Sequence, residues 1–171
     1  MGDRVSRGDV EAVFNAFTTG GWSVLLHGGV IKGAPADDLG SHGAIRPFAP
    51  WRGRHFCADD WHVILIATIE GGDQSFKQQD AERLLDPTQI TFTLDGVALS
   101  TTRTAVKRFL NPARFNFEVA YAFQEGRIMS PADLSVGQHT LTVVAAEPGQ
   151  PVFDNTIQFS IDPSGTGECV S

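Results

Sequence analysis

Cysteine, long apolar runs and clustered positive charge are all scarce in this chain of 171 residues. Its longest unbroken apolar stretch, VILIA at residues 63–67, is far too short to cross a bilayer, so we expect no membrane span. The formal net charge is −7, and the basic residues cluster only in pairs, as in WRGR and VKRF. Because nucleic-acid binders usually carry a basic face, we expect neither nucleic acid nor an anionic membrane surface as a partner.

The chain contains only two cysteines, Cys57 and Cys169. Two thiols in a cytosolic protein are ordinary, whereas two in a secreted protein usually pair. Two alternatives therefore stay open: free thiols, or a disulfide that ties the tail to the middle of the chain and stabilises the fold by roughly 4 kcal/mol. No signal peptide is visible in residues 1–14, although a leader removed earlier would leave no trace. We expect a secreted or cell-surface protein, and a cytoplasmic location stays open.

The remaining composition is that of an ordinary globular chain, with 42% hydrophobic and 19% charged residues. The segment RGDVEAVFNAF predicts a short amphipathic helix with Asp9 as its N-cap and with one apolar side formed by Val10, Val13, Phe14 and Phe17. Residues 21–33 suggest a strand or hairpin, and residues 33–54 are loop-like. We treat residues 1–59 as an N-terminal extension packed on the following domain.

From Trp61 onward the pattern is almost entirely β. Residues 61–72 are apolar on both alternating faces, which suits a central strand covered on both sides. FKQQDAERLLDP interrupts the strands with one or two helical turns, and Asp95–Gly96 is a strong hairpin signal. Phe115, Phe117, Val119, Tyr121 and Phe123 are expected on one face of a strand. About seven strands predict an all-β domain, an antiparallel β-sandwich over residues 60–162, followed by a tail over residues 163–171.

Two motifs give this region a family resemblance. ITFTLDGVALSTT (90–102) and LSVGQHTLTVVAAE (134–147), followed by NTIQFSID (155–162), resemble the immunoglobulin-like domains of bacterial extracellular enzymes and adhesins. The resemblance implies an immunoglobulin-like antiparallel β-sandwich used as a spacer, binding module or adhesive domain. His139 lies in the corner motif, where related sandwiches use a side chain to bond the turn backbone. The N-terminal extension has no counterpart in these domains.

The stretch HFCADDWH (55–62) raises the question of a metal site. Zinc or copper needs three or four converging imidazole, thiolate or carboxylate ligands, and His55, His62 and Asp59 are the candidates here, with His27 and His42 as further ligands. Local spacings that would preset such a site are absent. The alternative is structural: Asp59 and Asp60 end a loop, and His62 is an interior histidine that donates to a carbonyl.

Catalytic interpretations are weaker. A catalytic cysteine needs an electropositive setting, but Cys57 stands beside two aspartates. Trp22, Phe48 and Trp51 could form an aromatic platform for a glycan, or they could simply fill a core. We therefore expect a non-catalytic extracytoplasmic binding or structural module, for which a protein, polymer or glycan is a candidate ligand and no cofactor is needed. The alternatives are a zinc- or copper-binding protein or metal-dependent enzyme that uses the N-terminal histidines, and a self-assembling structural subunit. The oligomeric state stays open.

Overall fold

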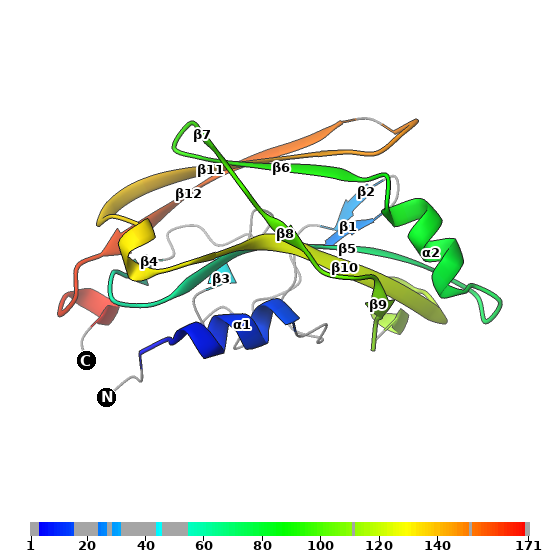
Figure 1. Cartoon of the computed structure of the whole chain (residues 1–171), viewed down its shortest axis with the longest axis horizontal. Coiled ribbons are helices and arrows are strands. Elements are labelled where there is room, and N and C mark those ends of the chain that lie inside the picture. The colour runs from blue at the N-terminus through cyan, green and yellow to red at the C-terminus, as the bar shows by residue number, and fades with distance from the viewer. Residues whose placement is uncertain are drawn as a thin grey trace.

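The computed structural model describes residues 4–15, 24–26, 29–31, 44–45, 55–110, 112–150 and 152–169. Two sheets face each other, and one helix covers the outer side of the first sheet (Figure 1). The predicted all-β sandwich of two sheets is therefore confirmed. Among the described residues, no helix is long and apolar enough to cross a membrane.

The first sheet, sheet A, is built around two long strands, β5 and β10, which pair in antiparallel register. The hairpin β1–β2 and strand β3 extend it beyond β5, and β8 and β9 both pair with β10 on its other side. Its strands are β1 (Val24–Leu26), β2 (Gly29–Ile31), β3 (Ala44–Ile45), β5 (His62–Gly72), β8 (Thr102–Arg103), β9 (Lys107–Arg108) and β10 (Val119–Met129).

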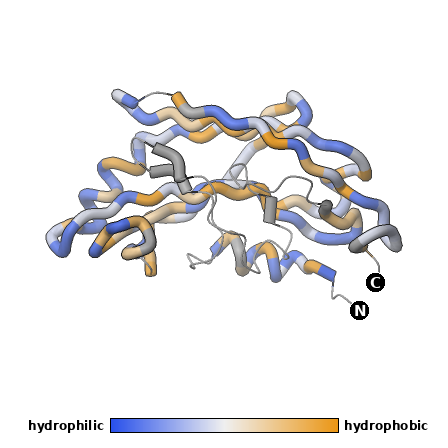
Figure 2. Tube along the Cα trace, turned by 180° about the vertical axis from the view of Figure 1, so that it is seen from behind, coloured by the Kyte–Doolittle hydropathy of each residue, from blue (hydrophilic) through white to orange (hydrophobic). Residues whose placement is uncertain are grey.

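The second sheet, sheet B, has the strand order β4-β12-β11-β6-β7. Its strands are β4 (His55–Cys57), β6 (Gln89–Leu94), β7 (Val97–Leu99), β11 (Gly137–Ala146) and β12 (Phe153–Asp162). The hairpin predicted at Asp95–Gly96 joins β6 to β7, and both residues have positive φ, 50° and 81°, as a type I′ turn requires. Figure 2 shows hydrophobic and hydrophilic residues alternating along these strands, which is the pattern of a half-buried sheet.

Strand direction departs from the sequence prediction at three places. The pairs β5–β10, β6–β7, β6–β11 and β11–β12 are antiparallel as expected. However, β1 and β3 pair with β5 in parallel, and β4 pairs with β12 in parallel. All three exceptions come from the N-terminal 59 residues, which add strands to both sheets. The division between residues 59 and 60 stays a prediction.

Strand β5 is covered on both faces, as its sequence predicts. Alternate residues Ile64 and Ile66 point into the core between the sheets, together with Phe92, Phe123, Leu141 and Ile161. Val63, Leu65, Ala67 and Ile69 form a second core with helix α1 (Arg7–Asn15), which contributes Val10 and Phe14. Both cores stabilise the folded state, because each Å² of apolar surface removed from water contributes about 25 cal/mol of free energy.

Helix α2 (Gln78–Leu85) fills the end of the sandwich at which β5 finishes (Figure 1). Its Ala81 and Leu85 belong to the core between the sheets, and the Lys77 N–H donates to Asp80 at 2.9 Å at its first turn. The described residues also include three short 3-10 helices, η2 (Pro112–Phe115), η3 (Pro131–Asp133) and η4 (Gly167–Cys169).

Two local predictions are wrong. Helix α1 begins at Arg7, and Ser6 is its cap: the Ser6 hydroxyl accepts the Asp9 N–H at 3.2 Å, while the Asp9 carboxylate accepts the Ser6 N–H at 2.7 Å. Asp9 is thus the third residue of a capping box rather than the N-cap. Phe115 ends η2, and Phe117 follows the turn at Asn116 and precedes β10. Both pack with the α1 core, whereas Phe123 faces the other core.

Candidate functional site: the two histidine environments and the disulfide

The stretch HFCADDWH lies at the end of the sandwich where the first and last described segments meet (Figure 1). Its first three residues form β4, which pairs with β12, and its last residue begins β5 in the opposite sheet. The stretch is therefore a crossing from one sheet to the other, rather than only the loop before a strand.

Cys57 and Cys169 form a disulfide with 5.4 Å between their Cα atoms and a sequence separation of 112. Of the two alternatives left open by the sequence, the structure shows the pairing. The bond fixes η4 against β4, which lies at the edge of sheet B. Because Cys57 carries no free thiol, it can act neither as a nucleophile nor as a thiolate metal ligand.

The adjacent aspartates fasten the N-terminal segment to this end. The Val5 N–H donates to the Asp60 carboxylate at 3.0 Å, and the Trp61 N–H donates to the Val5 carbonyl at 3.0 Å. Asp59 lies 3.2 Å from the Arg4 guanidinium at the surface. Burial raises the pKa of Asp60 above its usual range, although the Val5 bond and the charge of Arg4 act in the opposite direction.

His62 is buried without a hydrogen bond. Its side chain is 1% exposed, and neither ring nitrogen has a partner among the described residues. Its ring meets the ring of Phe56 edge to face, with 5.6 Å between centroids. Burial lowers its pKa to about 4, because the charged form would lose its hydration. The predicted bond from His62 to a carbonyl is therefore wrong, since no residue that the structure describes accepts a bond from either ring nitrogen.

His139 has the opposite surroundings. One ring nitrogen, Nδ1, lies 2.6 Å from the Asp95 carboxylate, and the other, Nε2, lies 2.7 Å from the Ser135 carbonyl oxygen. Asp95 also accepts the Thr140 N–H at 2.8 Å. Burial lowers the pKa of His139, but the bond to Ser135 and the bond and charge of Asp95 outweigh it and raise the pKa above the usual value. The bond to the turn backbone is the one predicted from the corner motif.

A series of ring contacts connects the two histidines across the core. His62 contacts Phe56, Phe56 contacts Phe159 with centroids 5.9 Å apart, and Phe159 stacks on His139 at 5.4 Å. The four rings come from β5, β4, β12 and β11, so they tie both sheets together at the disulfide end. Nothing in the local sequence pairs Phe56 with Phe159, because β4 and β12 are far apart along the chain.

The predicted metal ligands are placed as follows. His62 is buried in the core, Asp59 is at the surface with Arg4, and His55 lies in β4, where the structure describes only its backbone. In the part of the chain that the structure describes, no group of three His, Cys, Asp and Glu side chains could hold a metal ion. His27 and His42 lie outside the described residues, as do the platform residues Trp22, Phe48 and Trp51. The metal site and the platform stay predictions.

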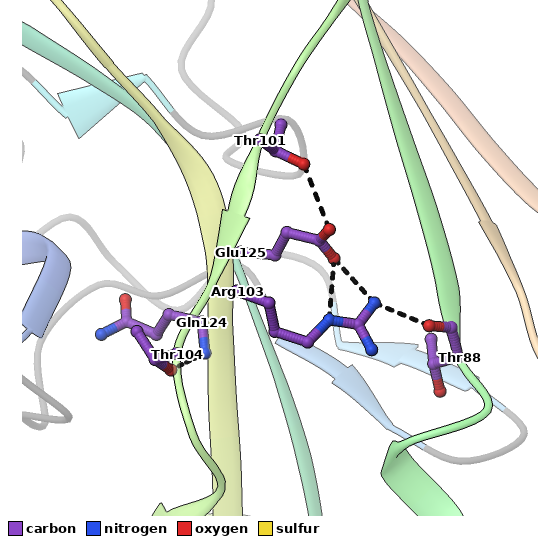
Figure 3. Close-up of polar contacts among 6 residues, drawn as sticks. All are labelled: Thr88, Thr101, Arg103, Thr104, Gln124 and Glu125. Carbon is purple, nitrogen blue, oxygen red and sulfur yellow. Dashed lines mark hydrogen bonds and ion pairs between the residues drawn. The ribbon is translucent and has the colours of Figure 1, made fainter.

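A polar network that was not predicted from the sequence lies at the edge of sheet A formed by β8 (Figure 3). Arg103 donates to the buried Glu125 carboxylate through Nη2 at 2.8 Å and Nε at 3.2 Å, and Nη2 reaches the Thr88 carbonyl at 2.6 Å. Thr101 donates to the other oxygen of Glu125 at 3.1 Å. The guanidinium also lies 4.1 Å from the centroid of the Phe123 ring. A signal was available: Glu125 occupies an inward position two residues after Phe123.

This network joins parts of the fold rather than presenting a reactive group. Arg103 connects β8 to β10 and also reaches the segment that leads into β6, so it fastens the edge of sheet A to sheet B. Both oxygens of Glu125 accept hydrogen bonds: Oε1 accepts one from Thr101, and Oε2 accepts two from Arg103. Glu125 is buried while Arg103 stays partly exposed, and charge-assisted hydrogen bonds of this kind hold a side-chain geometry in place.

No protein-family model matches the sequence, and no curated protein is significantly similar to it. Among solved structures, the chain is similar to a cysteine protease inhibitor, EhICP2, from Entamoeba histolytica, with 13% identity and a TM-score of 0.30. That likeness covers 63% of this chain and 83% of the inhibitor. At this TM-score the likeness supports no argument about fold or function.

Proposed function

We propose that the chain is an immunoglobulin-like, non-catalytic binding module that works outside the cytoplasm. The strand order supports the fold. In an immunoglobulin domain the second, fifth and fourth strands share one sheet, and the third, sixth and seventh strands share the other. If β5 corresponds to the second immunoglobulin strand, β10 corresponds to the fifth strand and β8–β9 to the fourth, all in sheet A. In sheet B, β6, β11 and β12 then correspond to the third, sixth and seventh strands, and β7 lies beside β6.

The corner before β11 supports the same assignment. Immunoglobulin-like domains often place a tyrosine near the start of the sixth strand, and its hydroxyl bonds the backbone a few residues upstream. His139 occupies that place and bonds the carbonyl of Ser135, four residues earlier. One departure is clear: the disulfide joins β4 to the tail and does not join the second strand to the sixth.

The observation that supports the binding function is that the two ends of the sandwich differ. The Cys57–Cys169 disulfide and the first residues of the described chain lie at one end, and the connections β5–β6, β9–β10 and β11–β12 lie at the other (Figure 1). Immunoglobulin variable domains bind ligands through loops gathered at one end of the sandwich. A module held at its disulfide end would present these three connections to a partner.

Side chains at that free end fit a contact surface. Each of the three connections carries an exposed apolar residue: Leu84 on α2, Leu110 before η2, and Val152 before β12. Two of the connections are anchored by buried side chains, since α2 packs into the core through Ala81 and Leu85 and since Phe115 packs on Phe109. Rigid presentation lowers the entropy that binding would cost. The ligand class that we propose is a protein or a glycan polymer.

Location outside the cytoplasm is supported by the disulfide, because such bonds persist mainly in oxidising compartments. Alkylating the thiols in intact producing cells before lysis would test this. We expect Cys57 and Cys169 to be protected from the reagent. Quantitative alkylation of both residues in the intact cells would contradict the proposed location while leaving the fold untouched.

Binding is tested with a glycan array and a phage library of random peptides as defined probes. We expect selected binders to lose affinity for the variant L84D/L110D/V152D at least tenfold. They should retain affinity for V97D/V136D, whose exposed apolar residues lie at the other end in the β6–β7 hairpin and the corner. The reverse pattern, or no binder from either probe, would contradict the proposal.

A further inference from the structure

The disulfide divides the chain into two parts: the residues before Cys57, which bear the tension when the chain ends are pulled apart, and the loop between Cys57 and Cys169, which does not. α1, β1, β2, β3 and β4 all lie before or at Cys57, and all elements from β5 to β12 lie between Cys57 and Cys169. We infer that the disulfide carries the tension past the part of the sandwich formed by β5 to β12. Force between residues 1 and 171 then detaches the residues before Cys57 and leaves β5 to β12 folded. This inference does not depend on the proposed ligand.

Without the bond, tension would run through the sandwich itself. It would leave β4 toward the N-terminus and β12 toward the C-terminus. Because β4 and β12 are parallel, these two directions oppose each other along the strands, and the ladder between them is loaded in shear. That ladder has three residue pairs, Ser160 with His55, Ile161 with Phe56 and Asp162 with Cys57. The disulfide from Cys57, which belongs to the last of these pairs, to Cys169 replaces this short ladder as the mechanical connection.

The N-terminal helix remains in the path of the force. α1 is held by the buried side chains Val5, Val10 and Phe14 and by a few hydrogen bonds at its two ends. At one end the Val5 backbone bonds Asp60 and Trp61, and at the other Gln124 Nε2 donates to the Phe14 carbonyl at 2.7 Å. Detaching α1 would remove its cover from Val63, Leu65, Ala67 and Ile69 on the outer face of sheet A. The fold therefore couples tension to exposure of an apolar face.

Single-molecule pulling with handles at residues 1 and 171 tests the inference. Without reductant, we expect extension limited to the residues before Cys57, at most roughly 200 Å at the length of an extended chain. Adding reductant to molecules held under load should release a further step of roughly 370–400 Å, because 112 residue steps then become extensible. The long step before reductant, or its absence afterwards, would overturn the inference.

Moving the handle from residue 171 to Val97 distinguishes two explanations: that the disulfide carries the tension, or that the sandwich itself resists the force. A handle on Val97, attached through an azide-bearing residue, puts β5 and β6 into the force path with the disulfide intact. We expect roughly 130–145 Å of additional extension there at moderate force, from the 40 residues after Cys57 up to Val97. If the sandwich resists this pull as firmly as the end-to-end pull, its own strength explains the result and the inference is wrong.

Two variants complete the test. C57S/C169S should show the long step in the absence of reductant, and reduction under load covers the case in which this variant does not fold. Phe14→Ala should lower the force of the early, short extension at least twofold, because Phe14 anchors α1. It should leave the reductant-dependent step unchanged. A Phe14→Ala change that instead alters the long step would show that α1 belongs to the protected part.

Discussion

His62 and His139 are both buried and are connected through Phe56 and Phe159, yet they respond to pH in opposite ways. Both ring nitrogens of His139 lie beside an acceptor, so its protonated form is favoured. Neither ring nitrogen of His62 has a described partner, so its neutral form is favoured. The comparison shows that burial alone does not decide the charge of a histidine; the acceptors within hydrogen-bonding distance do.

Each environment gives a stability contribution with its own sign. The pKa of His62 falls from 6.5 to about 4 on folding, so its neutral form is fully tolerated above pH 6.5 and stability is lost as pH falls from 6.5 toward 4. The pKa of His139 is raised, so its contribution is fully present below pH 6.5 and is lost as pH rises through the folded value. The two histidines therefore weaken the fold on opposite sides of neutrality.

Removing the disulfide should break the comparison most strongly. We expect C57S/C169S to lose about 4 kcal/mol of unfolding free energy, since the bond closes a loop with a separation of 112 residues. β4 should then loosen, and Phe56 with it, so the pKa of His62 should move up toward 6.5 while that of His139 stays raised. Urea unfolding and a histidine NMR titration measure the two effects. Equal shifts of both histidines would contradict the idea that β4 buries only one of them.

Acidification should show the cost of the unpartnered ring. From the pKa of about 4, His62 makes the protein about 3 kcal/mol less stable at pH 4 than at pH 7, apart from other groups. His62→Leu should abolish this difference and leave stability at pH 7 equal or slightly higher, because an apolar side chain leaves no unsatisfied nitrogen. Urea unfolding between pH 4 and 7 measures it. An unchanged acid slope in His62→Leu would place the titrating group elsewhere.

The same substitution at the other histidine should have the opposite effect. His139→Leu leaves the Ser135 carbonyl and the Asp95 carboxylate without their donor, and we expect a loss of roughly 2–3 kcal/mol at pH 6. Leu at both positions controls for volume and apolar burial. If both variants were destabilised equally at pH 6, the hydrogen bonds of His139 would not distinguish the two sites.

Much of this end of the molecule could be predicted from sequence, and the reasons are local. The alternation of Ile90, Phe92 and Leu94 and the Asp95–Gly96 turn specify β6 and its hairpin within a few residues. The corner histidine was also predictable, because its acceptor at Ser135 lies only four residues away. These features depend on neighbours along the chain.

What could not be predicted depends on partners that are distant in sequence. The parallel pairing of β4 with β12 and the packing of Phe56 on Phe159 join residues about a hundred positions apart. Whether His62 finds an acceptor depends on the side chains across the sandwich, and a histidine flanked by apolar residues is compatible with either outcome. The Arg103–Glu125 pair lies between these extremes, because an inward-facing glutamate indicates that a partner is needed without naming it.

Asp95→Asn should sharpen the comparison with the smallest change. Asp95 has φ of 50°, a conformation that asparagine also adopts readily, and an amide oxygen can still accept the Thr140 N–H. The negative charge beside His139 and the acceptor for its Nδ1–H are both lost, because the amide nitrogen takes the place of the second carboxylate oxygen. The pKa of His139 should therefore fall toward its usual value, and stability at pH 6 should drop by about 1 kcal/mol. The loss of stability between pH 6 and 8.5 should then shrink, while the acid-side loss from His62 stays the same. A histidine NMR titration with urea unfolding at both ends of the range measures this, and an unchanged alkaline slope would show that the charge of Asp95 does not hold the proton on His139.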